Sequence, residues 1–230
     1  MRVEIWSDIV CPWCYIGKRR FETALARFPH ADEVDVMWRS FELDPTAPRR
    51  REGNQIEHLA RKYGMTIEQA RATREHLRQV AADVGLEYRF DVAQPGNTLD
   101  AHRLLHLAAS RGIQDRMKER LLAAYFTEGA PIGDRDTLVQ LAGAVGLEPT
   151  EAEATLASDD YVTDVRSDEE EAAALRITGV PFFVIDRKFG VSGAQPADFL
   201  LEALERAWSD SQLLVVTAGA ESGGGDSCAI

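Results

Sequence analysis

The sequence predicts an α/β fold in which a helical block is inserted into a small unit of strands and helices. Near the N-terminus, a strand at 3–7, a helical pattern at 15–28 and an alternating strand at 34–41 form a β–α–β unit. Near the C-terminus, strands at 182–185 and 190–193 precede a final helix. Between these two pieces, more than a hundred residues show helical patterns.

The N-terminal elements follow from side-chain composition and spacing. The stretch 3–7 is short and rich in branched and aromatic residues, as in a buried strand, and 34–41 alternates between apolar and polar side chains. The helical stretch places large apolar residues three to four positions apart, or at multiples of that spacing, at Tyr15, Phe21, Leu25 and Phe28. Strand, helix and strand in this order indicate a parallel pair.

Helix-start patterns divide the middle of the chain. Capping boxes are predicted at Thr66 with Gln69, Thr150 with Glu153 and Ser167 with Glu170. Asn97 is a further N-cap candidate, and the acidic run at 168–171 is interpreted as the first turn of a helix. The segment 86–92 is either a brief strand or an extended connection. The predicted domains are 1–45 with 178–208, an inserted helical domain at 54–177, and a flexible C-terminal tail at 209–230.

The net charge of −12 excludes some classes of partner. An acidic surface repels phosphate backbones, so nucleic acid is not expected as a partner. No stretch approaches the roughly 20 apolar residues that span a bilayer, and the N-terminus lacks the apolar core of a signal peptide. We therefore expect a cytoplasmic protein without a membrane partner, in a compartment that keeps thiols reduced.

The motif CPWC at 11–14 lies where the first strand passes into the first helix. The first turn of a helix presents unpaired N–H groups and a positive dipole end, which favour a thiolate. Cys11 is therefore the predicted nucleophile, and Cys14, one turn later, is the predicted resolving cysteine. Pro12 suits the first helical turn, and Trp13 is expected at the surface beside the sulfur.

Two such cysteines can also hold a metal, lie inert in a core or form a static disulfide. A tetrahedral zinc site needs four ligands, and the chain has no second CXXC motif and no HXXXH motif, so no metal is expected. Two inert core cysteines are seldom placed at the start of a helix after a strand. A static disulfide does not fit a reducing compartment.

Pro181 is a second candidate site residue, because it directly precedes a predicted strand in the stretch TGVPFF. A cis bond at Val180–Pro181 would leave the Val180 backbone free to pair with an extended substrate. An ordinary trans proline that opens an edge strand is the other interpretation. The residues alone leave both open.

Four stretches together resemble the DsbA family of thioredoxin-fold proteins, in particular its FrnE-like branch. They are CPWCYIG, GVPFFVID, PGNTLDAHRLLHLA and PIGDRDTLVQLAGAVGL. The resemblance covers residues 1–208 and implies a thioredoxin fold with an inserted helical domain. It implies that Cys11 attacks, that Cys14 resolves and that Pro181 is cis. Substrate contacts are expected at Val180, Phe182, Asn97 and His102.

The resemblance also implies the kind of partner. The expected substrates are protein or small-molecule thiols and disulfides, with no tightly bound cofactor and with glutathione as a candidate co-substrate. A monomer or a homodimer is expected. Isomerases of 2-hydroxychromene-2-carboxylate and kappa-class glutathione transferases look similar, but they typically carry serine without a resolving cysteine. A redox-inactive chaperone or binding module is the non-enzyme alternative.

Some residues depart from the family pattern, and others are interpreted as having no role in the chemistry. Periplasmic DsbA proteins typically have histidine within the motif, and its absence beside Cys11 predicts a less oxidising site. Cys228 has no neighbouring cysteine in the tail and is interpreted as an unpaired thiol. His106 is interpreted as structural, and Lys18 and Arg19 as solvated.

Overall fold

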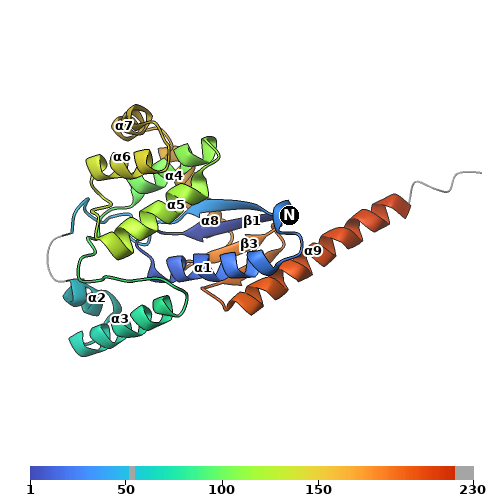
Figure 1. The fold of residues 1–230 in the computed structure, drawn as a ribbon, viewed down its shortest axis with the longest axis horizontal. Coiled ribbons are helices and arrows are strands. Elements are labelled where there is room, and N and C mark those ends of the chain that lie inside the picture. The colour runs from blue at the N-terminus through green and yellow to red at the C-terminus, as the bar shows by residue number, and fades with distance from the viewer. Residues whose placement is uncertain (52–54, 221–230) are drawn as a thin grey trace, which may run out of the picture.

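The computed structural model describes residues 1–51 and 55–220, and a four-stranded sheet lies at its centre (Figure 1). The strands are β1 (Arg2–Ser7), β2 (Asp35–Ser40), β3 (Phe182–Ile185) and β4 (Phe189–Ser192), in the order β2-β1-β3-β4. β1 pairs parallel with β2 and antiparallel with β3, and β3 pairs antiparallel with β4. The predicted β–α–β and β–β–α pieces therefore share one sheet, which confirms the predicted fold class.

Helices cover both faces of this sheet. α1 (Pro12–Arg27) and α9 (Ala197–Ala220) pack together on one face, where Phe21, Phe183 and Leu204 belong to one buried apolar cluster. On the other face, Trp6 of β1 packs in a smaller cluster with Ala172 of α8 (Val162–Ala174). β1 is buried on both sides, which explains its nearly continuous apolar composition.

The inserted helices build a second core that reaches the CPWC motif. They are α2 (Gln55–Tyr63), α3 (Ile67–Ala82), α4 (Leu99–Ser110), α5 (Gln114–Ala123), η2 (Ala124–Glu128), α6 (Arg135–Ala144), α7 (Pro149–Ala157) and α8. Thr66 and Gln69 form the predicted capping box at the start of α3. The core of these helices includes Ile9, Tyr15 and Ile16, which flank the cysteine pair in sequence. The motif therefore lies between the sheet and the inserted helices.

Some predicted boundaries are wrong, and one open alternative is decided. α9 continues past Trp208 to Ala220, so residues 209–220 belong to a helix, and only 221–230, with Cys228, lie outside the described residues. α8 begins at Val162 instead of Ser167, because buried Val165 extends its apolar face towards the inserted core. Segment 86–92 contains no strand, so of the two predicted alternatives the connection is the correct one.

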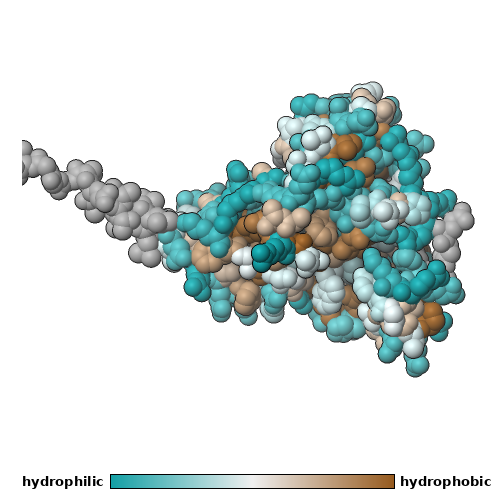
Figure 2. Space-filling view, turned by 180° about the vertical axis from the view of Figure 1, so that it is seen from behind, coloured by the Kyte–Doolittle hydropathy of each residue, from teal (hydrophilic) through white to brown (hydrophobic). Residues whose placement is uncertain are grey.

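The outer surface is largely hydrophilic. Figure 2 shows polar residues over most of one face, with hydrophobic residues gathered towards its middle. None of the described helices is long and apolar enough to cross a membrane.

Candidate active site

The cysteine pair lies at the start of α1, as the sequence predicts. Cys11 is the N-cap residue with an extended backbone, and Pro12 occupies the first helical position. The backbone N–H of Cys14 donates to the Cys11 sulfur over 3.3 Å. Cys14 is fully buried and Cys11 is 4% exposed, whereas Trp13 is 38% exposed. The pair is therefore held together, with Trp13 at the surface beside it.

The segment around Pro181 faces the attacking cysteine. The Val180–Pro181 peptide bond is cis, and the Cys11 thiol donates to the Val180 carbonyl over 3.4 Å. Among the described residues, the Val180 N–H has no hydrogen-bond acceptor. Phe182, half-buried, begins β3 directly afterwards. The fold thus brings together two motifs that lie far apart in the sequence.

Gly17 makes this approach possible. A Cβ atom at position 17 would lie 2.8 Å from Cγ of Pro181, which is closer than carbon atoms can pack. Glycine in the middle of a helix is otherwise unfavourable by about 0.5–1 kcal/mol relative to alanine. The glycine that follows CPWCYI is therefore part of the site, and its place inside a predicted helix was the available sequence signal.

Burial opposes the Cys11 thiolate that a helix start favours. Burial raises the pKa of Cys11 well above its ordinary value, and the neighbouring Cys14 side chain acts in the same direction. The Cys14 N–H lowers the pKa, but one donor does not replace the water that burial removes. A thiolate at this pair therefore needs a compensating positive charge nearby.

Asp8, between β1 and the cysteine pair, is a fully buried carboxylate with several donors. Oδ1 accepts from the Ile9 N–H over 2.7 Å and lies 3.2 Å from Nε2 of His102, and Oδ2 accepts from the Leu43 N–H over 2.9 Å. Burial acts to raise the pKa of Asp8, but His102 and the Leu43 N–H outweigh it and lower the pKa. Asp8 is therefore a fixed negative charge beneath the motif.

Two predicted substrate residues have structural roles here. His102 is fully buried on Asp8, so the expectation that it faces a substrate is wrong. Asn97 accepts from the Leu99 N–H and donates to the Pro45 carbonyl, which ties the start of α4 to the 45–48 loop. His106 lies 3.2 Å from Asp168 in α8, as its structural interpretation predicts.

Lys18 of α1 and Lys118 of α5 are both buried close to the Trp38 ring. Lys18, predicted to be solvated, is 1% exposed in its side chain and forms ion pairs with Glu22, Asp115 and Glu119. Lys118 of α5 is fully buried, and its Nζ donates to the Ser7 carbonyl over 3.3 Å. No pattern in the sequence distinguishes either lysine, because their neighbours come from distant segments.

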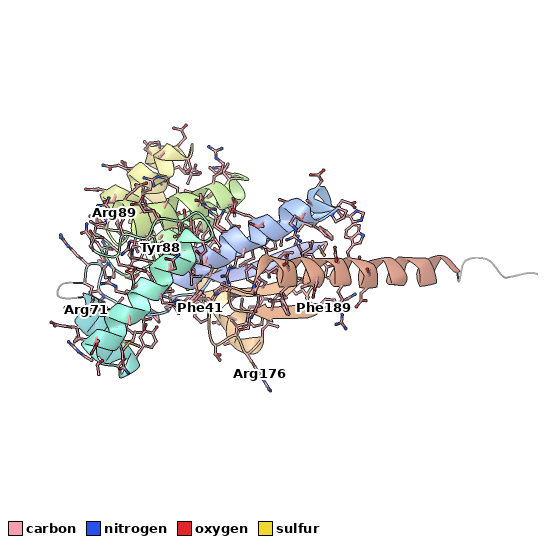
Figure 3. All side chains as sticks on the ribbon, turned by 60° about the horizontal axis from the view of Figure 1, so that its bottom comes forward. Phe41, Arg71, Tyr88, Arg89, Arg176 and Phe189 are labelled. Carbon is pink, nitrogen blue, oxygen red and sulfur yellow. The ribbon has the colours of Figure 1, made fainter. Side chains whose placement is uncertain are left out.

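A cavity of about 710 Å³ adjoins the motif through Tyr88. The Tyr88 hydroxyl donates to the Pro12 carbonyl over 2.6 Å, and its ring lines the cavity. Arg71 and Arg89 also line it and form no ion pair with any described residue. Figure 3 shows these three residues on the side of the molecule formed by α3 and the segment that follows it.

No candidate metal centre occurs in the part of the chain that the structure describes. Within residues 1–51 and 55–220, no group of three or more histidine, cysteine or acidic side chains is placed to hold a metal ion.

A helix-start cysteine pair that faces a cis-proline, on a four-stranded sheet of this order, defines a thioredoxin-like thiol protein. Residues 2–205 match the family model described as the DSBA-like thioredoxin domain. The chain belongs to this family, whose members include thiol oxidoreductases, and the resemblance noted in the sequence is confirmed.

Individual relatives agree with this assignment. A probable DsbA oxidoreductase from Streptomyces coelicolor is 50% identical, with a TM-score of 0.87 over 91% of this chain and 90% of that chain. The uncharacterized protein YwbO of Bacillus subtilis is 28% identical over 92% of this chain and 98% of its own. The cytosolic disulfide reductase DsbM of Pseudomonas aeruginosa, solved with glutathione, is 20% identical, with a TM-score of 0.62 over 93% and 99%. At that identity, DsbM shares the fold.

Proposed function

We propose that the protein is a thiol–disulfide oxidoreductase that works through Cys11 and Cys14. The Cys11 sulfur attacks a substrate disulfide, forms a mixed disulfide and releases one substrate thiol. The Cys14 sulfur then attacks Cys11, so the second substrate thiol leaves and the pair is oxidised. The reverse sequence oxidises a substrate dithiol. The observation that supports this proposal most strongly is the Cys11 thiol, held by the Cys14 N–H and facing Val180 beside Pro181.

The proposed docking edge for the substrate is the backbone at Val180. Its N–H has no acceptor among the described residues, so an extended peptide can accept a hydrogen bond there, as in strand addition. Trp13, in the motif, is exposed, and Phe182, directly after Pro181, is partly exposed, so both offer aromatic surface to a substrate. This arrangement favours substrates whose disulfide is flanked by an extended, partly apolar segment.

Glutathione is a proposed small-molecule co-substrate. Its carboxylates suit Arg71 and Arg89 in the cavity beside Tyr88, because arginine pairs well with carboxylates. DsbM, a cytosolic disulfide reductase of the same fold that was solved with glutathione, supports this proposal and a cytoplasmic location. Substitution of both arginines with glutamine should weaken turnover of glutathione disulfide more than that of an uncharged disulfide.

Trapping of the mixed disulfide tests the main proposal. Cys14→Ala leaves Cys11 without its resolving partner, so a covalent adduct through Cys11 should accumulate with a disulfide-containing protein. Cys11→Ala is the matched control and should form no such adduct. Wild-type protein should also reduce insulin in the presence of a thiol reductant. If no adduct and no insulin reduction were seen, the proposal would be wrong.

The same variants separate the two alternatives from the main proposal. A glutathione-dependent isomerase would keep its activity on a chromene substrate in Cys14→Ser, because that chemistry does not need a resolving thiol. A binding module would keep its full function with both cysteines replaced.

A further inference from the structure

Tyr88 connects the inserted helical domain to the CPWC motif, and the exchange mechanism proposed above does not use it. Its side chain is only 4% exposed, and its hydroxyl donates to the Pro12 carbonyl over 2.6 Å. Tyr88 belongs to the connection that follows α3, and Figure 3 shows it beside the start of α1. An irregular segment of the inserted domain therefore contacts the backbone between the two cysteines directly.

Both chain neighbours of Tyr88 are fixed to the π-helix η2. The Arg89 N–H donates to the Phe126 carbonyl over 2.7 Å. The Thr127 hydroxyl donates to the Glu87 carbonyl over 2.8 Å. The Phe126 ring also stacks on the Tyr88 ring, with 4.6 Å between the ring centres. Single π-helical turns are rare and often occur at functional sites. Here η2 holds both the backbone and the ring of Tyr88, so its hydroxyl has a defined direction.

The Pro12 carbonyl lies between the attacking sulfur and the N–H that contacts this sulfur. The ring of Pro12 fixes its φ, so ψ is the remaining backbone freedom of this residue. A hydrogen bond to the Pro12 carbonyl restricts ψ, because rotation about ψ turns that carbonyl. The chain continues from Pro12 to the Cys14 N–H, which donates to the Cys11 sulfur over 3.3 Å. A rotation at Pro12 would therefore change the contact between this donor and the sulfur.

We propose that Tyr88 is a positioning residue that holds the first turn of α1 in the geometry in which Cys11 reacts. Three observations support it: the burial of Tyr88, its hydrogen bond to the Pro12 carbonyl, and the attachment of its neighbours to η2. Tyr88 acts through the backbone of Pro12. The inserted domain thereby controls the reactivity of a cysteine on the sheet domain through a neutral hydrogen bond. The proposal rests on the exchange function proposed above.

Tyr15 provides a matched comparison for Tyr88. It belongs to the same aromatic cluster, since its ring stacks on that of Tyr88 with 6.2 Å between the ring centres. Its hydroxyl donates to Glu119 of α5 over 2.7 Å, and not to the backbone of the motif. If the Tyr88 bond only stabilised the fold, loss of either hydroxyl would have the same kind of effect. If it positions Cys11, only the loss at Tyr88 changes the reactivity of that thiol.

The test compares Tyr88→Phe with Tyr15→Phe in reduced full-length protein at neutral pH. Iodoacetamide alkylates a thiol by forming a C–S bond and releasing iodide, and fragment-ion mass spectrometry assigns the modified cysteine. Tyr88→Phe should slow alkylation of Cys11 about fivefold, or about 1 kcal/mol in activation free energy, because the Cys14 N–H is then less well aligned to stabilise the thiolate. Tyr15→Phe should keep the wild-type rate.

Two further measurements separate positioning from loss of stability. Each variant loses one hydrogen bond, so both should lower the denaturant midpoint of unfolding by a similar amount. In insulin reduction, Tyr88→Phe should lower kcat about fivefold and leave KM unchanged. The reason is that Val180 and Phe182, at the proposed docking edge, keep their surroundings.

Thr127 allows the attachment to η2 to be tested without a change at Tyr88. Thr127→Val removes the hydroxyl that donates to the Glu87 carbonyl, so alkylation of Cys11 should slow about twofold. Thr127→Ser keeps a hydroxyl and should restore the wild-type rate. These two variants keep the proposal testable if Tyr88→Phe does not fold. Equal rates in Thr127→Val and Thr127→Ser would show that η2 does not position Tyr88.

The outcomes distinguish this proposal from the proposed function. Alkylation needs no disulfide substrate, so the reactivity of Cys11 is measurable even if no protein disulfide is turned over. Absence of insulin reduction and of trapping would contradict the oxidoreductase alone. Equal alkylation rates of Cys11 in wild type and Tyr88→Phe would overturn the role of Tyr88, and so would an equal slowing in Tyr15→Phe.

Discussion

Lys18 and Lys118 are two buried lysines on the same tryptophan, and their surroundings differ. Their Nζ atoms lie 5.8 Å and 5.5 Å from the centre of the Trp38 ring. Lys18 pairs with three carboxylates, whereas Lys118 has a backbone carbonyl. Burial acts to lower the pKa of both, but Asp115, Glu22 and Glu119 outweigh it at Lys18 and raise that pKa.

The difference shows that pairing, and not burial, decides what a buried lysine does. A buried charge with carboxylate partners holds elements together, here α1 and α5. A buried charge without one responds to any anion that appears nearby. At Lys118 the negative charge of Asp8 favours the ammonium, but burial outweighs it and lowers the pKa.

The largest expected effect comes from removal of the fixed anion near Lys118. Asp8→Asn should lower the free energy of unfolding by about 3 kcal/mol at neutral pH. The new amide NH₂ must face either the Leu43 N–H or the pair of donors at Ile9 and His102, and the fixed negative charge is lost. Denaturant unfolding of the variant beside wild type would measure this loss of stability.

The pH dependence provides the check on Asp8→Asn. The pKa of Asp8 is lowered in the folded protein, so its contribution to stability is present above the unfolded pKa of about 3.9 and is lost as the pH falls through the folded value. Wild type and variant should therefore converge in stability under strongly acidic conditions. A loss below about 1 kcal/mol at neutral pH would show that the Asp8 carboxylate is not a needed charge.

The same substitution should change the free energy of unfolding in opposite directions at the two lysines. Lys18→Met should destabilise the fold by about 1–2 kcal/mol, because it leaves three carboxylates facing one another. Lys118→Met should stabilise it by about 1–2 kcal/mol at neutral pH, because it removes a buried charge without a carboxylate partner. Denaturant unfolding of both variants beside wild type measures the pair.

Their pH profiles should differ as well. Between about pH 8 and 10.5, the folded state has lost the Lys118 proton that the unfolded chain retains, so this residue makes stability rise with pH. Lys118→Met should lose that contribution. Lys18 has the higher pKa in the folded state, so its contribution is present below the unfolded value and is lost as the pH rises through the folded one. Stability changes of the same sign in the two variants would contradict the comparison.

The smallest effect is expected at Asp115, one of the three carboxylates around Lys18. Asp115→Asn makes the same chemical change as Asp8→Asn, but should cost about 0.5 kcal/mol. Asp115 is 60% exposed in its side chain, Glu22 and Glu119 remain to pair with Lys18, and the amide oxygen can still accept from the Trp38 indole. A loss as large as that of Asp8→Asn would show that the pairing around Lys18 is not redundant.

The sequence predicts the parts of the site that depend on local order. A strand before Cys11, a proline at the first helical position and a second cysteine one turn later are sufficient to place the pair at a helix start. Thr66 and Gln69 likewise cap α3 as predicted, because a capping box is made within four residues. The approach of Pro181 to Cys11 was reached through resemblance, since no local rule connects them.

The errors concern residues whose role depends on distant partners. Lys18 is predicted to be solvated from its helix position, yet Asp115 and Glu119 of α5 cover it. Asp168 is assigned to a helix start, but α8 begins earlier and its carboxylate accepts from the Ser40 N–H. His102 is predicted to meet a substrate, and is buried on Asp8 instead.

The sequence by itself determined where the cysteine pair lies, because CPWC between a strand and a helix fixes the backbone around both sulfurs through short-range geometry. It also determined the α/β class, because strand and helix periods are local properties. Only the tertiary structure decided the electrostatic environment. Whether Cys11 is buried, whether Lys118 is paired and where Asp8 lies depend on segments that can be more than a hundred residues apart in the sequence. The free energies of burial and pairing are set by the contacts that folding creates.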